Sequence, residues 1–137
     1  MSIPTTLMPG AIMPTRGSTF AAGIDLYASE DHTVTRKQSI VKTGVKMAIP
    51  TGYVGLIWSR SSMAYKNGVF TEAGVIDSDY RGEIGVVMFA NQENFQIKRG
   101  DKIAQLLIQP VSMATPVIVE SLDTSVRGEG GFGSTGK

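Results

Sequence analysis

The stretch IGVVMFA, residues 84–90, is a continuous apolar run that is rich in β-branched side chains. A second run, IAQLLI, covers residues 103–108 and contains one polar residue, Gln105. Short apolar runs of this composition, bounded by turn residues, are typical of buried strands. We therefore predict two central strands at these positions and a fold built on β-sheets.

Shorter segments around these runs alternate between apolar and polar residues, as half-buried strands do. Val, Ile and Thr make up about a quarter of the chain, and such β-branched residues favour strands over helices. The alternating segments are residues 45–49 (VKMAI), 95–98 (FQIK) and 117–120 (VIVE), and the turn residues between strands are Gly52, Gly68, Gly82 and 99–101 (RGD).

Only residues 59–66 have helical character, with a serine-rich start and Gly68 as the expected stop. The chain of 137 residues is long enough for one domain and leaves little room for a second. We predict a single all-β domain, a sandwich or jelly-roll-like barrel, with one short helix.

Charge and composition exclude several classes of function. Lys and Arg number 13 against 12 Asp and Glu, so the net charge of +1 gives no general reason to bind a nucleic acid or an anionic membrane. The absence of cysteine excludes disulfides, thiol nucleophiles and cysteine zinc sites. The single histidine, His32, lies in the polar stretch 30–33, where we expect a solvated loop. A catalytic base in this chain is therefore expected to be a carboxylate.

No segment approaches the roughly 18 consecutive apolar residues of a membrane span, and the first ten residues lack the basic start and apolar run of a signal peptide. We expect an intracellular, cytoplasmic protein, or a nuclear one if its source is eukaryotic or viral.

Four segments place polar residues where chemistry is conceivable. Residues 59–62 (SRSS) precede the helix, as either an anion site or a serine cap with a surface arginine. Residues 73–82 (AGVIDSDYRG) form either a turn or a site with two acids and a tyrosine. Asp25 and Gln105 each interrupt an apolar run, where an unpaired carboxylate in particular is costly.

The last twelve residues, 126–137, are rich in glycine and cannot form a core. They are either a frayed terminus or a segment that wraps a nucleotide, because an arginine, an aromatic ring and closely approaching backbone N–H groups suit that role.

Taken together, five segments resemble, in order and spacing, the five motifs of the trimeric dUTPases, which hydrolyse deoxyuridine triphosphate. The resemblance extends from about Pro14 to the last residue. The segments are residues 22–28 (AGIDLYA), 59–64 (SRSSMA), 73–82 (AGVIDSDYRG), 99–107 (RGDKIAQLL) and 127–136 (RGEGGFGSTG).

The resemblance implies the following roles in base, sugar and water binding. Asp77 would be the general base that activates a water against the α-phosphorus, releasing dUMP and pyrophosphate. Tyr80 would pack under the deoxyribose and exclude a 2′-hydroxyl. Uracil would be read largely by backbone groups, on the two arms of a hairpin that contains Gly74, Val75, Ile76 and Gly85. Cytosine would present mismatched donors and acceptors, and a thymine methyl would clash.

The resemblance also implies a phosphate and metal site. Arg60, Ser61 and Ser62 would hold the α- and β-phosphates. Mg²⁺ would be chelated mainly by the triphosphate, with its waters contacting Asp25 and Gln105.

From the tail, Arg127 would reach the γ-phosphate and Phe132 would stack on uracil, while Gly133, Ser134 and Thr135 would close over the phosphates. The implied assembly is a homotrimer in which the domain 1–125 of one subunit receives the arm 126–137 of another. The implied role is to limit uracil incorporation into DNA and to supply dUMP for thymidylate synthesis.

The second motif departs from the family pattern, because Ser59 and Ser62 replace a usual proline and glycine. Ile24 stands where many relatives have an aromatic residue, and Trp58 directly precedes the motif. We expect a tuned site and no loss of a catalytic group.

Two alternatives share the fold. A dCTP deaminase would use a glutamate on the strand after the third motif, and residues 84–90 contain no acid. A nucleotide-responsive regulatory protein would keep the motifs, and a regulatory insert, which would mark it, is not visible at this length.

Overall fold

The computed structural model describes residues 1–136, which form twelve strands and one short helix. The strands are β1 (Thr5–Leu7), β2 (Thr15–Arg16), β3 (Ile24–Tyr27), β4 (His32–Val34), β5 (Ser39–Lys42), β6 (Val45–Met47), β7 (Tyr53–Trp58), β8 (Val69–Glu72), β9 (Val75–Ile76), β10 (Gly85–Ala90), β11 (Phe95–Ile97) and β12 (Lys102–Pro110), and the helix is α1 (Ser61–Asn67). The all-β class with one short helix is confirmed.

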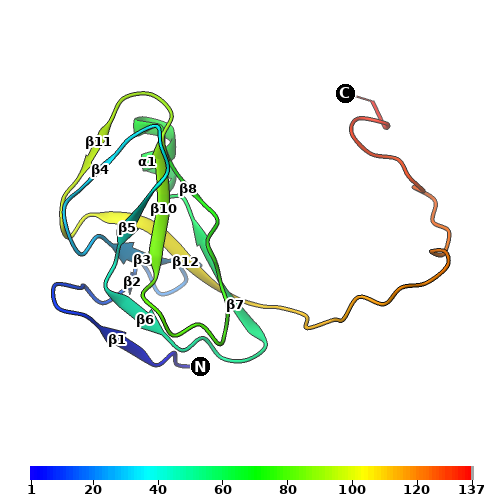
Figure 1. Cartoon of the computed structure of the whole chain (residues 1–137), viewed down its shortest axis with the longest axis horizontal. Coiled ribbons are helices and arrows are strands. Elements are labelled where there is room, and N and C mark those ends of the chain that lie inside the picture. Colours follow the sequence, from blue (N-terminus) through cyan, green and yellow to red (C-terminus); the bar gives the residue numbers. More distant parts are fainter. Residues whose placement is uncertain (137) are drawn as a thin grey trace.

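All strand pairs are antiparallel and they form four separate sheets. The largest has the order β2-β3-β12-β7-β9, and the second has the order β5-β10-β8. The pairs β1-β6 and β4-β11 complete the body (Figure 1). The ladders do not close into a continuous barrel. Both predicted central strands, β10 and β12, are flanked by a partner on each side.

The core lies between the sheets and consists of aliphatic side chains that alternate along the strands. In β10, Val86, Met88 and Ala90 are buried and the residues between them are half-buried. Among the described residues, the buried polar side chain is Thr43. Its hydroxyl donates to the Ile84 carbonyl oxygen at 2.5 Å and accepts from the Val45 N–H at 3.1 Å. Because the hydroxyl is paired twice, its burial carries no unsatisfied group.

The helix ends at Gly68 as predicted, with φ of 63° and its N–H bonded to the Met63 carbonyl. This left-handed conformation is one that glycine adopts without steric cost. Of the two alternatives for residues 59–62, the serine cap does not form, because the N-cap residue is Arg60 and no side chain caps the helix. The Ser59 hydroxyl is instead engaged with β8, where it accepts from the Thr71 N–H at 2.9 Å.

His32 lies in β4 and is half-buried, so the predicted solvated loop is wrong. Its Nε2 is 2.8 Å from the Ser39 hydroxyl oxygen, and β11 pairs with β4 along this segment. The pairing with β11 is made by residues more than 60 positions away, which the local polar sequence does not reveal.

The predicted strand at residues 117–120 does not form. The chain leaves the body after β12 and runs away from it through residues 111–136, orange to red in Figure 1. Val117 and Ile118 are 82% and 100% exposed. An alternating pattern makes a strand only where a partner supplies backbone hydrogen bonds, and none of the described residues pairs with this segment.

No helix among residues 1–136 is long and apolar enough to cross a membrane.

The close packing on β7 generates a stability prediction. A Cβ on Gly55 would lie 2.6 Å from Ile49 Cδ1 and 3.1 Å from Ile76 Cβ, so Gly55→Ala overpacks the sheet. We expect a loss of about 1–3 kcal/mol in the free energy of unfolding, measured by chemical denaturation. The matched control is Gly17→Ala, since a Cβ there meets nothing within 4 Å. Equal stability of the two variants would contradict this packing.

Candidate functional site

The segment that joins β9 to β10 lines a cavity of about 290 Å³. The cavity contains the predicted site residues Val75, Ile76, Asp77, Tyr80 and Gly85, together with two residues that the sequence analysis did not name, Ile40 and Glu83.

Two backbone edges that lack a strand partner border this cavity. Strand β9 lies at the edge of its sheet, with β7 on one side only. Strand β8 pairs with β10 only from Val87 onward, so the start of β10 has no partner on that side. An unpaired edge keeps its N–H and C=O groups available. The cavity is therefore bordered by backbone donors and acceptors that are suited to a flat, polar ring.

The turn that carries Asp77 is held by local hydrogen bonds. The Tyr80 N–H donates to the Asp77 carbonyl at 3.1 Å, and the Tyr80 hydroxyl donates to the Glu83 carbonyl at 2.7 Å. The ring lies so close to Gly82 that a Cβ there would be 2.4 Å from the phenol oxygen. Tyr80 is therefore fixed as a wall of the cavity, and the Asp77 side chain is exposed at its edge.

Gly74 does not line this cavity. Its carbonyl accepts from the Ile57 N–H at 2.8 Å, and a Cβ on it would lie 3.0 Å from Ile57 Cβ. With φ of 94°, Gly74 turns the chain from β8 into β9, and Ala73 before it also has a positive φ of 55°. In the single chain, Gly74 therefore shapes the hairpin and holds it against β7.

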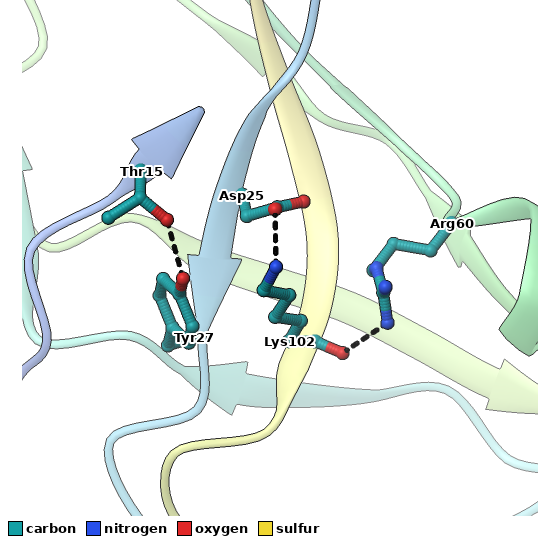
Figure 2. Close-up of polar contacts among 5 residues, drawn as sticks. All are labelled: Thr15, Asp25, Tyr27, Arg60 and Lys102. Carbon is teal, nitrogen blue, oxygen red and sulfur yellow. Dashed lines mark hydrogen bonds and ion pairs between the residues drawn. The ribbon is translucent and has the colours of Figure 1, made fainter. Parts of the chain in front are cut away.

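A second group of predicted residues gathers on the outer face of the five-stranded sheet. Asp25 on β3 stands directly opposite Gln105 on β12, which in turn stands opposite Trp58 on β7. The Asp25 carboxylate pairs with the Lys102 ammonium at 3.0 Å, as Figure 2 shows. Gln105 Nε2 donates to the Ser59 carbonyl at 3.1 Å. Both polar residues that interrupt apolar strands are thus paired rather than isolated.

An irregularity in β12 brings Lys102 to this face. Strict alternation would place Lys102 and Gln105, three residues apart, on opposite faces of the sheet. The register against β3 shifts between Lys102 and Ala104, and the extra residue leaves Ile103 and Ala104 both buried. A bulge of this kind re-aims the side chains that follow it. Lys102 and Gln105 therefore flank Asp25 on the same side.

Arg60 connects this group to the start of the helix. Its Nη1 donates to the Lys102 carbonyl at 3.2 Å (Figure 2). Arg60, Ser62 and Lys102 line a further cavity of about 250 Å³. Two cationic side chains and the first backbone N–H groups of a helix form an environment suited to phosphate groups. Ser61 is the first residue of this helix.

The cavity that contains Asp77 and the group around Arg60 lie toward different ends of β7. Because Ile76 stands opposite Gly55, Asp77 follows beside Val54, six residues before Arg60. Six residues of extended chain span about 20 Å. Asp77 and Arg60 therefore lie toward opposite ends of β7.

The tail residues touch neither group in the described chain. Residues 127–136 are mostly exposed, and Phe132 is fully exposed. Arg127 bonds only locally, with its Nε donating to the Gly130 carbonyl at 2.6 Å. Gly133, Ser134 and Thr135 lie in turns of the same segment.

Three residues at these sites were missed from the sequence. Lys102 lies inside the fourth motif, but strict alternation along the strand would place its side chain on the face opposite to that of Gln105. Ile40 reaches the cavity that contains Asp77 only through the pairing of β5 with β10. Glu83 directly precedes the apolar run 84–90, and its Oε2 accepts from the Gly44 N–H at 3.2 Å.

The residues suit Mg²⁺ only as water contacts. Within residues 1–136 no group of three His, Cys, Asp or Glu side chains is placed to hold a metal ion. One carboxylate, Asp25, and one amide, Gln105, lie side by side. A hard cation that keeps its waters and takes its direct ligands from a triphosphate fits such a donor set.

Comparison with known proteins decides the family. The family model described as dUTPase matches residues 10–136. The chain belongs to the dUTPase family.

Curated relatives agree with this assignment. The deoxyuridine 5'-triphosphate nucleotidohydrolase of Debaryomyces hansenii is 49% identical over 131 residues, covering 93% of this chain and 82% of the relative. The corresponding enzyme of Saccharomyces cerevisiae is 50% identical over 129 residues, covering 92% and 88%. This dUTPase is therefore a dUTP nucleotidohydrolase, as the sequence motifs predicted.

Solved dUTPase structures share the fold. A point mutant of the phage 80alpha dUTPase superposes with a TM-score of 0.91 at 29% identity, over 97% of this chain and 98% of that one. Another 80alpha mutant, solved with the dUTP analogue dUpNHpp, gives a TM-score of 0.88 at 29% identity over 99% of both chains. A phage phi11 mutant, with a TM-score of 0.83 at 29% identity over 88% of this chain and 98% of that one, contains a structural Mg²⁺ ion. The jelly-roll-like fold is thus confirmed.

Proposed function

We propose that this dUTPase hydrolyses dUTP between the α- and β-phosphates, with Asp77 as the general base. Asp77 would take a proton from a water whose oxygen bonds to the α-phosphorus. The bond to the bridging oxygen breaks, and dUMP and pyrophosphate leave. The observation that carries the proposal is that Asp77 shares one cavity with Tyr80 and Gly85, between two unpaired backbone edges.

The cavity suits a uracil nucleoside. The free N–H and C=O groups of β9 and of the start of β10 would pair with the O2, N3–H and O4 groups of uracil. A cytosine ring presents a different order of donors and acceptors, so it would leave backbone groups unpaired at a cost of about 1–3 kcal/mol each. The fixed ring of Tyr80 would lie under the deoxyribose and leave no space for a 2′-hydroxyl.

Arg60, Ser61 and Ser62 would hold the α- and β-phosphates, and the Lys102 carbonyl orients the Arg60 guanidinium for this task. Mg²⁺ would neutralise charge on the triphosphate when bound. Asp25 and Gln105 would contact the waters of the metal ion. The Asp25 carboxylate would then face two cations, the Lys102 ammonium and Mg²⁺. Positioning and charge neutralisation then supply most of the rate.

The site would be assembled from more than one copy. General-base catalysis needs Asp77 within about 3 Å of a water at the phosphorus that Arg60 also approaches. Within one chain Asp77 and Arg60 lie toward opposite ends of β7, with about 20 Å of extended strand between them, and this supports a site that is shared between subunits. We therefore propose a homotrimer in which the Asp77 cavity of one subunit meets the Arg60 group of the next.

The tail of a third subunit would close the site. Residues 111–136 leave the body after β12 and run far beyond it (Figure 1). Arg127 would contact the γ-phosphate, and the exposed ring of Phe132 would stack on uracil. Such a segment would order on the ligand and exclude water from the reaction. Through this reaction the enzyme would limit uracil incorporation into DNA and supply dUMP for thymidylate synthesis.

Substrate choice tests the base and sugar readout together. We expect the protein with Mg²⁺ to release pyrophosphate from dUTP and to leave dCTP, dTTP and UTP essentially unchanged. Consumption of UTP would contradict the role of Tyr80. Deamination of dCTP would show that Glu83 works as a proton shuttle despite its bond to Gly44.

The base assignment is tested by Asp77→Asn, which keeps the shape of the side chain and removes its basicity. We expect turnover to fall by about 10²–10⁴-fold with dUpNHpp binding retained. Binding is measured by calorimetry and by the emission of Trp58, which stands opposite Gln105. Asp79→Asn is the matched control, and near-normal turnover of Asp77→Asn would remove Asp77 from the base role.

Sharing of the site is tested by mixing two inactive variants, Asp77→Asn and a chain that ends at Val126. Each alone should be inactive, and the truncated chain should keep the size of the intact assembly by light scattering. Co-refolded subunits should recover a measurable fraction of activity, because some sites combine an intact cavity with an intact tail. No recovery, despite mixed assemblies seen by mass spectrometry, would mean that one subunit supplies both parts.

A further inference from the structure

Ile40 is a large aliphatic side chain that the fold leaves largely in solvent. It is 62% exposed, whereas Val41 beside it is fully buried. A single exposed apolar residue needs no explanation by itself. Ile40, however, lines the cavity that holds Asp77 and Tyr80, although it comes from a different sheet than β9.

The pairing of β5 with β10 determines where the side chain of Ile40 lies. Lys42 stands opposite Gly85 and Ile40 stands opposite Val87, so Ile40 and Gly85 are diagonal neighbours on the same face. A Cβ on Gly85 would lie only 2.5 Å from Ile40 Cγ2. The isoleucine therefore fills the space that a side chain at position 85 would take, and it closes the cavity on the β5 side.

A pyrimidine ring has one polar edge, with O2, N3–H and O4, and one apolar edge, with C5–H and C6–H. Backbone groups of β9 and of the start of β10 can pair with the polar edge. The methyl groups of Ile40 cannot form hydrogen bonds, so they suit the apolar edge. A β-branched side chain is also stiff at χ1, and its contact with Gly85 limits it further. Ile40 is therefore poorly able to move aside for a larger base.

The geometry points to Ile40 as the residue that limits the size of the group at C5 of the base, and thereby excludes thymine. This inference rests on the proposed function, in which the cavity between β9 and β10 binds the base. It assigns the discrimination between dUTP and dTTP to a side chain outside the five sequence motifs, on β5.

The test is Ile40→Ala, measured as kcat/KM for dUTP and for 5-fluoro-dUTP, dTTP and 5-bromo-dUTP. Fluorine is close to hydrogen in size, whereas methyl and bromine are larger. We expect the preference for dUTP over dTTP and 5-bromo-dUTP to fall by about tenfold or more, as for a methyl-sized space in an apolar pocket. The preference for dUTP over 5-fluoro-dUTP should change by less than about twofold. Ile40→Val should lie between the two proteins.

The matched control is Leu7→Ala, since Leu7 is a strand residue that is 46% exposed and does not line the cavity. It should leave every ratio unchanged, and thermal unfolding checks that each variant is folded. A folded Ile40→Ala that turns over dUTP and still rejects dTTP as strongly as the wild type would overturn the inference.

Failure of the proposed function gives a different result, namely no turnover of dUTP by the wild type. The role of Ile40 is then tested without turnover, by measuring the binding of dUpNHpp and of its 5-methyl counterpart by calorimetry. A ratio of the two dissociation constants that is the same in Ile40→Ala and wild type would overturn the assignment, and a ratio reduced by about tenfold would support it.

Discussion

The pairing of β12 with two neighbours is the constraint on which the group of Asp25, Arg60, Lys102 and Gln105 depends. Its inner residues Ile103, Ala104 and Leu106 are fully buried, and each large aliphatic side chain contributes about 1.5–3 kcal/mol on burial. That burial fixes the register against β3 and β7. The register in turn places Gln105 directly between Asp25 and Trp58. The packing of the core therefore determines the positions of these residues.

The base cavity depends on the opposite feature, namely strand edges that stay unpaired. Unpaired edges are usually a liability because they invite association with other chains. Here β9 and the start of β10 belong to different sheets, and the cavity beside their edges is bordered by Tyr80 and Ile40. The backbone N–H and C=O groups that would pair with a neighbouring strand in a continuous sheet remain available to a planar ring. In the proposed function these groups read the base.

Because these two features lie toward different ends of β7, the fold separates the Asp77 cavity from the Arg60 group. In the proposed assembly each subunit contributes its Asp77 cavity to one site and its Arg60 group to a second site. Its exposed tail would cover a site. Association and catalysis then depend on each other, since the catalytic base meets the phosphate only across a subunit boundary. A segment such as residues 117–120, which alternates like a strand and has no partner in its own chain, is consistent with this dependence.

Local patterns predicted much of this molecule. The apolar runs at residues 84–90 and 103–108 became the two central strands, and the helix stops at Gly68 as expected. The five motifs identified the family and named Asp25, Asp77 and Gln105. His32 was placed in a loop because its neighbours are polar, and only pairing with β11 makes it part of a strand. Lys102 was missed because alternation assigns it to the opposite face.

The sequence by itself determined the all-β class, the two central strands, the helix stop at Gly68 and the chemical groups available, because these depend on neighbours along the chain. Tertiary structure decided the pairing of Lys102 with Asp25, the contact of Ile40 with Gly85 and the position of Asp77 toward the end of β7 that lies away from Arg60. Each of these depends on strand register or on a bulge. Register is set by the burial of residues that are far apart in the chain. A local sequence pattern does not show which of these residues pack together.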